Sequence, residues 1–274
     1  MKIWVNGALR TADEARVSVF DHGLTVGDGV FETLKAVHGR PFALTRHLER
    51  LARSARGLGL PEPDLDEVRA ACAAVLDASP MPLGRLRVTY TGGLSPLGSD
   101  RGADGPTLVV ALGDAHPAPP STAAITVPWV RNERGALSGL KTTSYGENVV
   151  ALARAHERDA SEALFANTVG QLCEGTGSNV FVVVDGELHT PPLASGCLAG
   201  ITRALVVEWT GARETDLPMD VLDRADEVFL TSSLRDVQGV HRVDGRDLAQ
   251  APGPVTAKAL QIFQERSAAD PDPA

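Results

Sequence analysis

Residues 138–148 read SGLKTTSYGEN, and this loop carries the side chain on which the rest of the interpretation depends. Lys141 follows an apolar leucine and precedes small hydroxylated residues, between a predicted strand and a predicted helix. Partial desolvation would lower the pKa of its amine and make it a nucleophile, whereas full exposure would leave an ordinary solvated lysine. Lysine occurs only four times in the chain, so a reaction that needs an amine has few other candidates.

Two further stretches carry groups that could bind a charged or phosphorylated ligand. Glu174 stands just before a glycine-rich turn in LCEGTGSNVFVV (172–183), where its carboxylate either faces a buried positive group or caps the loop. Gly200, Ile201 and Thr202 lie at the start of a predicted helix. The free N–H groups of a helix start bind anions, although Thr202 could equally act as a simple N-cap.

Hydroxyl and guanidinium groups complete the set. Ser232 and Ser233 end a predicted strand in TSSLRDV, either as phosphate donors or in a simple turn. Arg50 shares a helix face with His47 in HLERL, either as a phosphate clamp or as a solvated arginine. An amine, a carboxylate, a helix N-terminus, paired serines and an arginine together match the needs of pyridoxal phosphate (PLP).

Composition and charge exclude several classes of protein. Hydrophobic residues make up 43% and charged residues 22% of the chain, as in a soluble packed protein. Acidic residues outnumber basic ones by 35 to 26, and the formal charge of −9 argues against nucleic acid as a partner. No apolar run is long enough for a signal peptide or a membrane helix, and the three cysteines lack metal-ligand spacing. We expect a cytoplasmic protein with no metal, membrane or nucleic-acid partner.

Strands and helices mix in both halves without strict alternation, which predicts an α/β protein made of two α+β lobes. The helices are predicted over 45–57, 65–76 and 146–158 and from about Thr202, and the strands over 2–5, 28–38, 85–91, 107–112, 123–130, 162–168, 179–190 (a hairpin) and 227–231. The Pro-rich segment 113–122 is predicted to connect a domain of residues 1–112 to one of residues 123–274. The tail after Arg266 is expected to be loose.

The motifs and their order resemble those of the class IV aminotransferases, the fold-type IV PLP enzymes, from about Ile3 to about Val240. The matching stretches are DHGLTVGDGVFETLK (21–35), HLERL (47–51), LKTTSYGENV (140–149), EGTGSNVF (174–181), GITR (200–203) and FLTSSLRDV (229–237). The resemblance implies a smaller N-terminal α/β domain and a larger C-terminal pseudo-barrel domain, with the cofactor between them. It also implies a homodimer.

The resemblance further implies a role for individual residues. Lys141 would form the internal aldimine with PLP and later shuttle the substrate proton, and Glu174 would pair with the protonated pyridine nitrogen. The remaining cofactor-binding residues would be Arg50, Ile201, Thr202 and Ser233 at the phosphate and Leu198 and Tyr145 beside the ring.

Substrate-binding positions separate the members of this family. D-amino acid transaminases hold the substrate carboxylate with a tyrosine, an arginine and a histidine, and these positions are Phe31, Leu97 and Ser99 here. Arg101, in the same loop, is a candidate replacement for the missing charge. The chain therefore resembles this group with an atypical carboxylate site.

Two other groups of the family remain open. The 4-amino-4-deoxychorismate lyases share Phe31, Thr33 and the VRNERGALSGLK stretch, but the asparagine and arginine expected after the lysine are Ser144 and Tyr145. Branched-chain L-amino acid transaminases have a tyrosine five residues after the lysine, whereas Tyr145 lies four after it.

We expect a PLP-dependent transaminase that moves the amino group of a small amino acid, preferably of D configuration, to a 2-oxo acid. The alternatives are the lyase, which would release pyruvate and 4-aminobenzoate, the branched-chain L-amino acid transaminase, and a PLP carrier with no catalytic need for Lys141.

Overall fold

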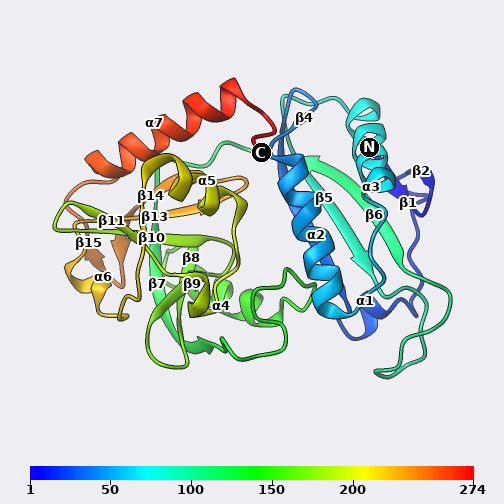
Figure 1. Ribbon diagram of the computed structural model, residues 1–274, viewed down its shortest axis with the longest axis horizontal. Coiled ribbons are helices and arrows are strands. Elements are labelled where there is room, and N and C mark those ends of the chain that lie inside the picture. Colours follow the sequence, from blue (N-terminus) through cyan, green and yellow to red (C-terminus); the bar gives the residue numbers. More distant parts are fainter. The chain divides into compact units, whose positions relative to one another are not determined.

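The computed structural model describes residues 1–274, which divide into two compact units (Figure 1). The first unit comprises Met1–His116, Leu140–Ser144 and Asp270–Ala274, and the second comprises Pro117–Gly139 and Tyr145–Ala269. The change from one unit to the other after His116 falls inside the Pro-rich segment 113–122. Two later segments nevertheless belong to the first unit, so the division is not a single cut along the sequence.

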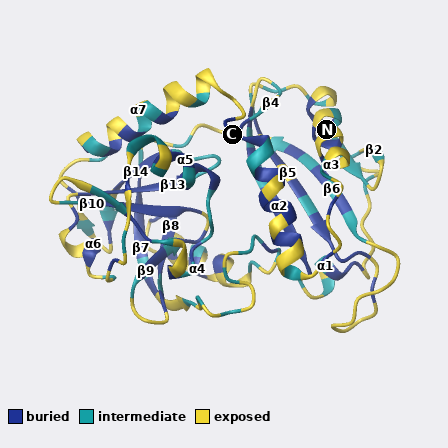
Figure 2. Ribbon diagram, in the orientation of Figure 1, coloured by how far each residue is buried: buried dark blue, intermediate teal, exposed yellow.

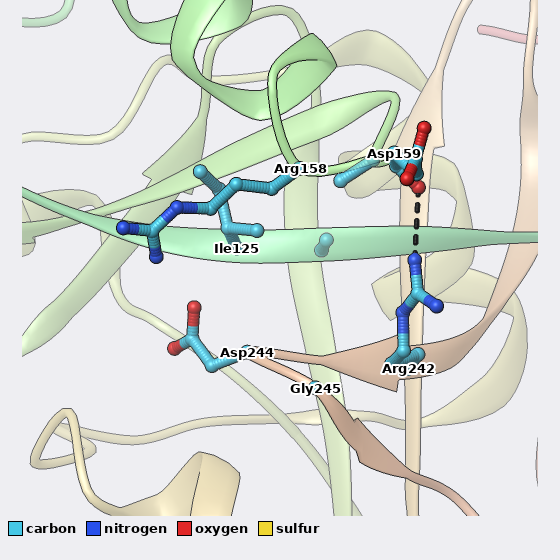
Figure 3. A pocket seen from close by; sticks show the side chains of 8 residues that line it. Ile125, Arg158, Asp159, Arg242, Asp244 and Gly245 are labelled. Carbon is cyan, nitrogen blue, oxygen red and sulfur yellow. Dashed lines mark hydrogen bonds between the residues drawn. The ribbon is translucent and has the colours of Figure 1, made fainter.

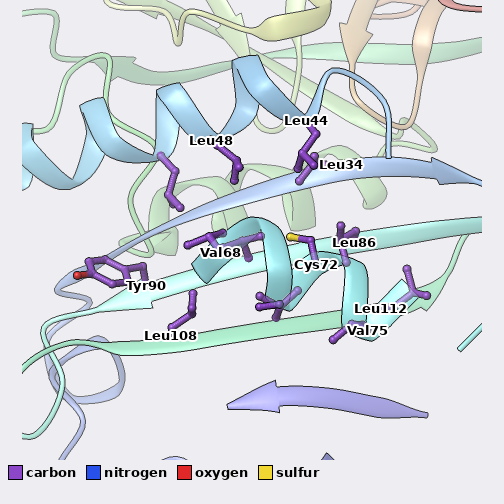
Figure 4. Packing of buried hydrophobic residues seen from close by; sticks show 14 of the residues in the cluster. Leu34, Leu44, Leu48, Val68, Cys72, Val75, Leu86, Tyr90, Leu108 and Leu112 are labelled. Carbon is purple, nitrogen blue, oxygen red and sulfur yellow. The ribbon is translucent and has the colours of Figure 1, made fainter. Parts of the chain in front are cut away.

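The first unit is built on a six-stranded sheet of order β2-β1-β6-β5-β3-β4. Its elements are β1 (Lys2–Val5), β2 (Ala8–Thr11), α1 (His22–Thr25), β3 (Gly29–Val37), β4 (Arg40–Pro41), α2 (Leu44–Leu58), α3 (Leu65–Ala78), β5 (Leu83–Thr91) and β6 (Thr107–Asp114). The long strands β3, β5 and β6 pair antiparallel. Successive side chains of each strand point to opposite faces of the sheet. One face is apolar and packs against α2 and α3 around Leu34, Leu48, Val75, Leu86 and Leu112 (Figure 4).

The segment that contains Lys141 lies along the first half of β3. The N–H of Phe31 donates to the Lys141 carbonyl over 3.0 Å, and the N–H of Thr143 donates to the Gly29 carbonyl over 2.8 Å. Backbone hydrogen bonds therefore attach this loop to the first unit, although its neighbours in sequence on both sides belong to the second.

The C-terminal tail is docked, so the expectation of a loose tail after Arg266 is wrong. Helix α7 (Pro254–Ala269) continues past this residue. Beyond it, the carboxylate of Asp272 accepts hydrogen bonds from the N–H and the hydroxyl of Thr45, over 2.8 and 2.7 Å. The N-cap of helix α2 is Ala43, which has a left-handed φ of 53° and forms no side-chain cap. The tail supplies that missing cap.

The second unit is built on a nine-stranded sheet of order β12-β11-β10-β13-β14-β7-β8-β9, with β15 paired to β14. Its elements are β7 (Ser121–Arg131), α4 (Gly146–His156), β8 (Glu162–Asn167), β9 (Leu172–Gly175), β10 (Asn179–Val184), β11 (Glu187–Thr190), the 3₁₀ turn η1 (Leu193–Ser195), α5 (Ile201–Thr210), β12 (Arg213–Glu214), α6 (Val221–Arg224), β13 (Glu227–Ser232), β14 (Asp236–Val243), β15 (Arg246–Asp247) and α7. The predicted Asp185-Gly186 turn joins β10 to β11, with φ of 52° and 77° at the two residues.

This second sheet curls back on itself. Strand β9 is last in the sheet order, yet a turn of three residues joins it to β10 near the other end, and Gly175 N–H closes the turn on the Ser178 carbonyl. The half-barrel form agrees with the predicted pseudo-barrel. Strands of both sheets are largely buried, whereas loops and the outer sides of the helices are exposed (Figure 2). No helix has the length and apolar character needed to cross a bilayer.

Candidate active site

The predicted site residues belong to both units. The first unit carries Phe31, Arg50, Leu97, Ser99, Arg101 and Lys141, and the second carries Tyr145, Glu174, Leu198, Ile201, Thr202 and Ser233.

Lys141 is fixed by contacts on both sides of its backbone. Its N–H donates to the Ser54 hydroxyl of α2 over 3.2 Å, and its carbonyl accepts from Phe31. Gly57 lies within α2 rather than ending the helix as the sequence suggested. Glycine is required there because a Cβ would come within 2.6 Å of the Leu140 side chain. The missing side chain thus lets Leu140 pack on α2, and the Lys141 ammonium lies 4.4 Å from the centre of the Phe31 ring.

A second cation, not identified from the sequence, lies over the same ring. The guanidinium carbon of Arg87, on β5, is 3.8 Å from the centre of the Phe31 ring. Arg87 is exposed, whereas Phe31 is only 5% exposed. Cation–π attraction to the ring stabilises both positive groups. The alternation of β5 could have shown which face Arg87 occupies, but not which strand lies beside it.

Arg50 is engaged with a buried carboxylate in the first unit. It donates from Nε and Nη2 to Glu32 over 2.8 and 2.7 Å, and His47 Nδ1 lies 2.6 Å from the same carboxylate. Burial opposes ionisation of Glu32, but the Arg50 charge and these hydrogen bonds outweigh it and lower the pKa of Glu32 to about 2. Burial also lowers the pKa of His47. The pair with Glu32 orients the guanidinium that the family resemblance assigns to the phosphate.

The loop over residues 92–106 is held by an ion-pair cluster. Arg101 donates bidentately to Asp28, over 2.6 and 2.7 Å, and also to the carbonyls of Leu58 and Gly59. All three of its nitrogens donate to these groups, and its role in substrate binding stays a prediction. Leu97 and Ser99, in the same loop, are exposed.

His22 belongs to the same cluster. Its Nδ1 lies 2.8 Å from Asp28, and its Nε2 lies 2.9 Å from the Gly98 carbonyl. A carbonyl can only accept, so Nε2 carries a proton, and a proton on Nδ1 is favoured by the carboxylate. The hydrogen bonds to Asp28 and Gly98 raise the pKa of His22 in spite of its burial. These two contacts of His22 tie the loop to Asp28, the residue before β3.

Glu174 is anchored in the second unit by a residue that the sequence reading missed. Arg131, at the end of β7, donates to Glu174 Oε1 over 3.1 Å and to the side chain of Asn148 over 2.5 Å. Its guanidinium carbon lies 4.0 Å from the centre of the Phe165 ring. The other oxygen of Glu174 accepts the N–H of Leu198 over 2.8 Å. Two donors thus orient the carboxylate that is predicted to pair with the pyridine nitrogen.

Buried Glu162 shapes the turn that follows Glu174. Its carboxylate accepts from the N–H of Thr176 over 2.8 Å, from the Thr176 hydroxyl, and from the Ser178 hydroxyl over 2.7 Å. A Cβ at Gly175 would lie 2.8 Å from the Glu162 carboxyl carbon. The Gly-Thr-Gly-Ser-Asn sequence therefore folds around an internal carboxylate, which explains its small and hydroxylated residues.

The start of α5 has the features of a phosphate cradle. Its N-cap, Gly200, makes no side-chain cap, and a Cβ there would lie 1.9 Å from the Asn179 side-chain oxygen. Thr231 pairs with Asn179 across β13 and β10, and its buried hydroxyl has no hydrogen-bond partner. An uncapped helix start next to an unsatisfied buried hydroxyl suits a phosphate. PLP therefore fits the residues present, and Glu174 is the carboxylate predicted to pair with its ring nitrogen.

Ile201 and Thr202 open α5 and are buried, whereas Ser233 and Tyr145 are half-buried. Tyr145 is the N-cap of α4 and makes no side-chain cap there. The one hollow described in the second unit, of about 290 Å³, contains none of the predicted site residues. Its rim includes Arg158 and Arg242, and the latter donates to the Asp159 carbonyl over 3.0 Å (Figure 3).

The first unit carries an amine, and the second carries an anchored carboxylate and a phosphate cradle, which are the groups that a PLP-dependent enzyme of the aminotransferase type requires. The family model described as amino-transferase class IV matches residues 29–243, and the chain belongs to this family of PLP-dependent aminotransferases. Its substrates are accordingly an amino acid and a 2-oxo acid.

Individual relatives differ in their described substrates. The chain is 33% identical to a putative branched-chain-amino-acid aminotransferase of Methanocaldococcus jannaschii, with 97% of this chain and 96% of the relative covered. It is 31% identical to a D-alanine aminotransferase of Bacillus licheniformis, with 96% of each covered. The structure resembles that of the branched-chain aminotransferase of Thermoproteus uzoniensis with norvaline, at a TM-score of 0.91 and 29% identity, over 97% of this chain and 94% of that one.

Proposed function

We propose that this aminotransferase acts on small amino acids with a preference for the D configuration and passes the amino group to a 2-oxo acid. The observation that carries the proposal is the placement of Lys141, whose backbone is pinned on both sides and whose amine lies over Phe31. The identity to D-alanine aminotransferase and the absence of the lyase-type asparagine and arginine after Lys141 support the D preference.

In the proposed reaction, Lys141, Glu174 and the start of α5 have separate roles. PLP supplies an electron sink for the carbanion that forms when the substrate Cα–H bond breaks. Lys141 holds and moves the proton at Nζ, because it is the one lysine fixed among the site residues. Glu174, oriented by Arg131 and the Leu198 N–H, would hold the ring nitrogen in its protonated form. The start of α5 would bind the phosphate.

The test is a half-reaction in which the holoenzyme is mixed with D-alanine or with L-leucine while the cofactor absorbance is followed. Conversion of the cofactor to its amine form by D-alanine, faster than by L-leucine, is the expected result. A reaction with L-leucine alone would refute the D preference. If neither amino acid reacts, release of pyruvate from aminodeoxychorismate is measured next. Lys141→Ala is expected to abolish turnover while cofactor binding is retained in part, and unchanged turnover would contradict the role of this lysine.

A second candidate function is transamination of branched-chain L-amino acids. The specific observation in its favour is the 33% identity to the Methanocaldococcus jannaschii relative, together with the structural likeness to the Thermoproteus uzoniensis enzyme. The L-leucine half-reaction decides between the two.

We also propose that the chain forms a homodimer. The first unit exposes a set of large apolar side chains on the segment 17–26 and the neighbouring loop, joined by the hydrogen bond from Ser95 N–H to the Phe20 carbonyl. The set comprises Val17, Val19, Phe20, Leu24, Val26, Leu94 and Leu97, each at least 43% exposed. A patch of this kind fits a second copy of the chain. Sedimentation should give a dimer that Leu24→Asp weakens, and a monomeric parent would refute the proposal.

A cytoplasmic location is proposed as well. Cys72, Cys173 and Cys197 are all buried and free, which is typical of proteins in a reducing compartment. Detection of the protein in a membrane or extracellular fraction would contradict this location.

A further inference from the structure

The amide of Asn148, the third residue of α4, is engaged at both of its ends. The residue is only 9% exposed. Its Oδ1 accepts a hydrogen bond from Nη2 of Arg131 over 2.5 Å, and its Nδ2 donates to the Thr176 carbonyl over 2.8 Å. A guanidinium only donates and a carbonyl only accepts, so these partners fix which end of the amide faces which. Asparagine is a weak helix former, so the helix itself does not require it at this position.

The guanidinium of Arg131 has acceptors of very different quality around it. Nε faces Glu174 over 3.1 Å, Nη2 faces Asn148, and Nη1 faces Glu147 over 3.4 Å. The Glu147 side chain is 74% exposed, and an exposed ion pair of this kind contributes little. The cation–π contact with Phe165 attracts the charge as a whole and does not select which nitrogen faces which acceptor. The buried bond to Asn148 is therefore the contact that keeps Nε turned towards Glu174.

The other end of the amide is attached to the turn that carries Glu174 itself. Thr176, two residues further along, donates from its N–H and its hydroxyl to the carboxylate of Glu162, which is 1% exposed. The contacts thus form a closed ring from Glu174 through Arg131 and Asn148 to Thr176, and back along the chain. All members of this ring belong to the second unit. A side chain that closes such a ring sets the position of Arg131 relative to the carboxylate.

We propose that Asn148 is a positioning residue, which holds Arg131 on Glu174 and so pre-organises this carboxylate for the ring nitrogen of PLP. The inference rests on the role that the proposed function gives to Glu174, and it holds whichever amino acid is the substrate. Without the amide, Nη2 of Arg131 loses its acceptor, and the guanidinium is free to shift towards Glu147. Glu174 then loses a donor that orients it, and the binding of PLP has to supply that order.

The test is a titration of the apoenzyme with two ligands, PLP and its deaza analogue, in which a carbon replaces the ring nitrogen. Asn148→Ala should raise the Kd of PLP about tenfold, the loss expected for one buried hydrogen bond, and should leave the Kd of the deaza analogue within about threefold of the parent value. Glu147→Gln is the matched control, because Glu147 is the preceding residue and contacts the same arginine. It should leave both Kd values within about twofold of the parent.

Two further variants separate positioning from a purely structural role. Asn148→Asp keeps an acceptor for Arg131 but places a carboxylate against the Thr176 carbonyl. Its PLP Kd should lie within about threefold of the parent, although its melting temperature should fall at least as far as that of Asn148→Ala. A residue that only satisfies the Thr176 carbonyl would give the same order for both measurements. In the Arg131→Lys background, Asn148→Ala should change the PLP Kd by less than about threefold, because the contact that the amide protects is already lost.

The outcomes that would overturn the proposal are distinct from those that concern the substrate. An equal rise in Kd for PLP and the deaza analogue, or a PLP Kd within threefold of the parent in Asn148→Ala, would overturn it. A parent that binds the deaza analogue as tightly as PLP would do the same, because Glu174 would then not pair with the ring nitrogen. Failure of the proposed substrate preference would show only in the half-reactions. If Asn148→Ala does not fold, Asn148→Ser, whose single hydroxyl cannot serve both partners, is judged by the same criteria.

Discussion

Replacement of Glu32 by glutamine tests whether the buried carboxylate organises the helix that carries Arg50. The native carboxylate is 0% exposed and lies within 2.6–2.8 Å of nitrogen atoms of Arg50 and His47. Glutamine removes the charge and leaves the 5% exposed Arg50 guanidinium without its anionic partner. Breaking a buried pair in this way costs about 3–5 kcal/mol. The shift in the pKa of Glu32 from 4.5 to about 2 independently corresponds to roughly 3 kcal/mol.

The assay is urea unfolding of the parent and of Glu32→Gln at pH 7, with cofactor affinity measured in parallel. Glu62→Gln is the matched control, because Glu62 pairs over 2.9 Å with Arg56 near the end of the same helix while both side chains are more than half exposed. The control should change the free energy of unfolding by less than about 1 kcal/mol.

The pH dependence of Glu32→Gln follows from the lowered pKa of Glu32. The stabilisation is complete above pH 4.5 and is lost as the pH falls towards 2, so the gap between parent and variant should narrow in that range. A variant within 1 kcal/mol of the parent at pH 7 would refute the reasoning.

Three further predictions concern single contacts. Arg131→Lys keeps the charge but cannot make both side-chain bonds of the arginine, so the cofactor Kd from absorbance titration should rise about tenfold, and an unchanged Kd would contradict the anchoring role. The pKa of His22 is raised, so its contribution to stability is complete below about pH 6.5 and declines as the pH rises through the raised value. Proteolysis within 92–106 should therefore accelerate with pH in the parent more than in His22→Asn, and equal slopes would argue against the contact. Asp272→Ala should cost about 1 kcal/mol in urea unfolding, close to the effect of Asp64→Ala at the N-cap of α3, and no loss would show that the tail does not cap α2.

Much of the local structure could be predicted from the sequence, because it depends on short-range patterns. The turn at Asp185-Gly186, the helix from Leu44 to Leu58 and the strand from Gly29 to Val37 follow from residues within a few positions of each other. Helix α7 and strand β14 were not predicted. Strand β14 does not alternate between buried and exposed residues, since residues 237–240 are all buried. Helix α7 buries only three of its residues, so its sequence has no clear apolar face. Helices and strands that are stabilised by packing against neighbouring elements, and that lack a clear hydrophobic periodicity of their own, cannot be predicted from the sequence in this way.

The candidate site shows the same division between local and long-range information. Lys141 and Glu174 stand out because their types and surroundings are unusual locally. Arg131 does not, since it lies 43 residues from the carboxylate that it holds, and the contact exists only because β7, β8 and β9 are neighbours in the sheet. The contact of Arg101 with Asp28 could not be predicted for the same reason, because the two residues are 73 positions apart.

Arg87 illustrates why charge totals cannot replace the placement of charge. A net charge of −9 argues against a polyanionic partner, but it says nothing about the charge on one face of one sheet. The strand alternation puts Arg87 on the uncovered face, the pairing with β3 brings it to Phe31, and the loop attached to β3 brings Lys141 to the same ring. The strand alternation can be seen in a contiguous stretch of sequence. The pairing of β5 with β3 and the attachment of the Lys141 loop to β3 join residues that are far apart in the sequence. Contacts that strand pairing creates therefore follow from the register of the sheet, and not from the motifs that identify the family.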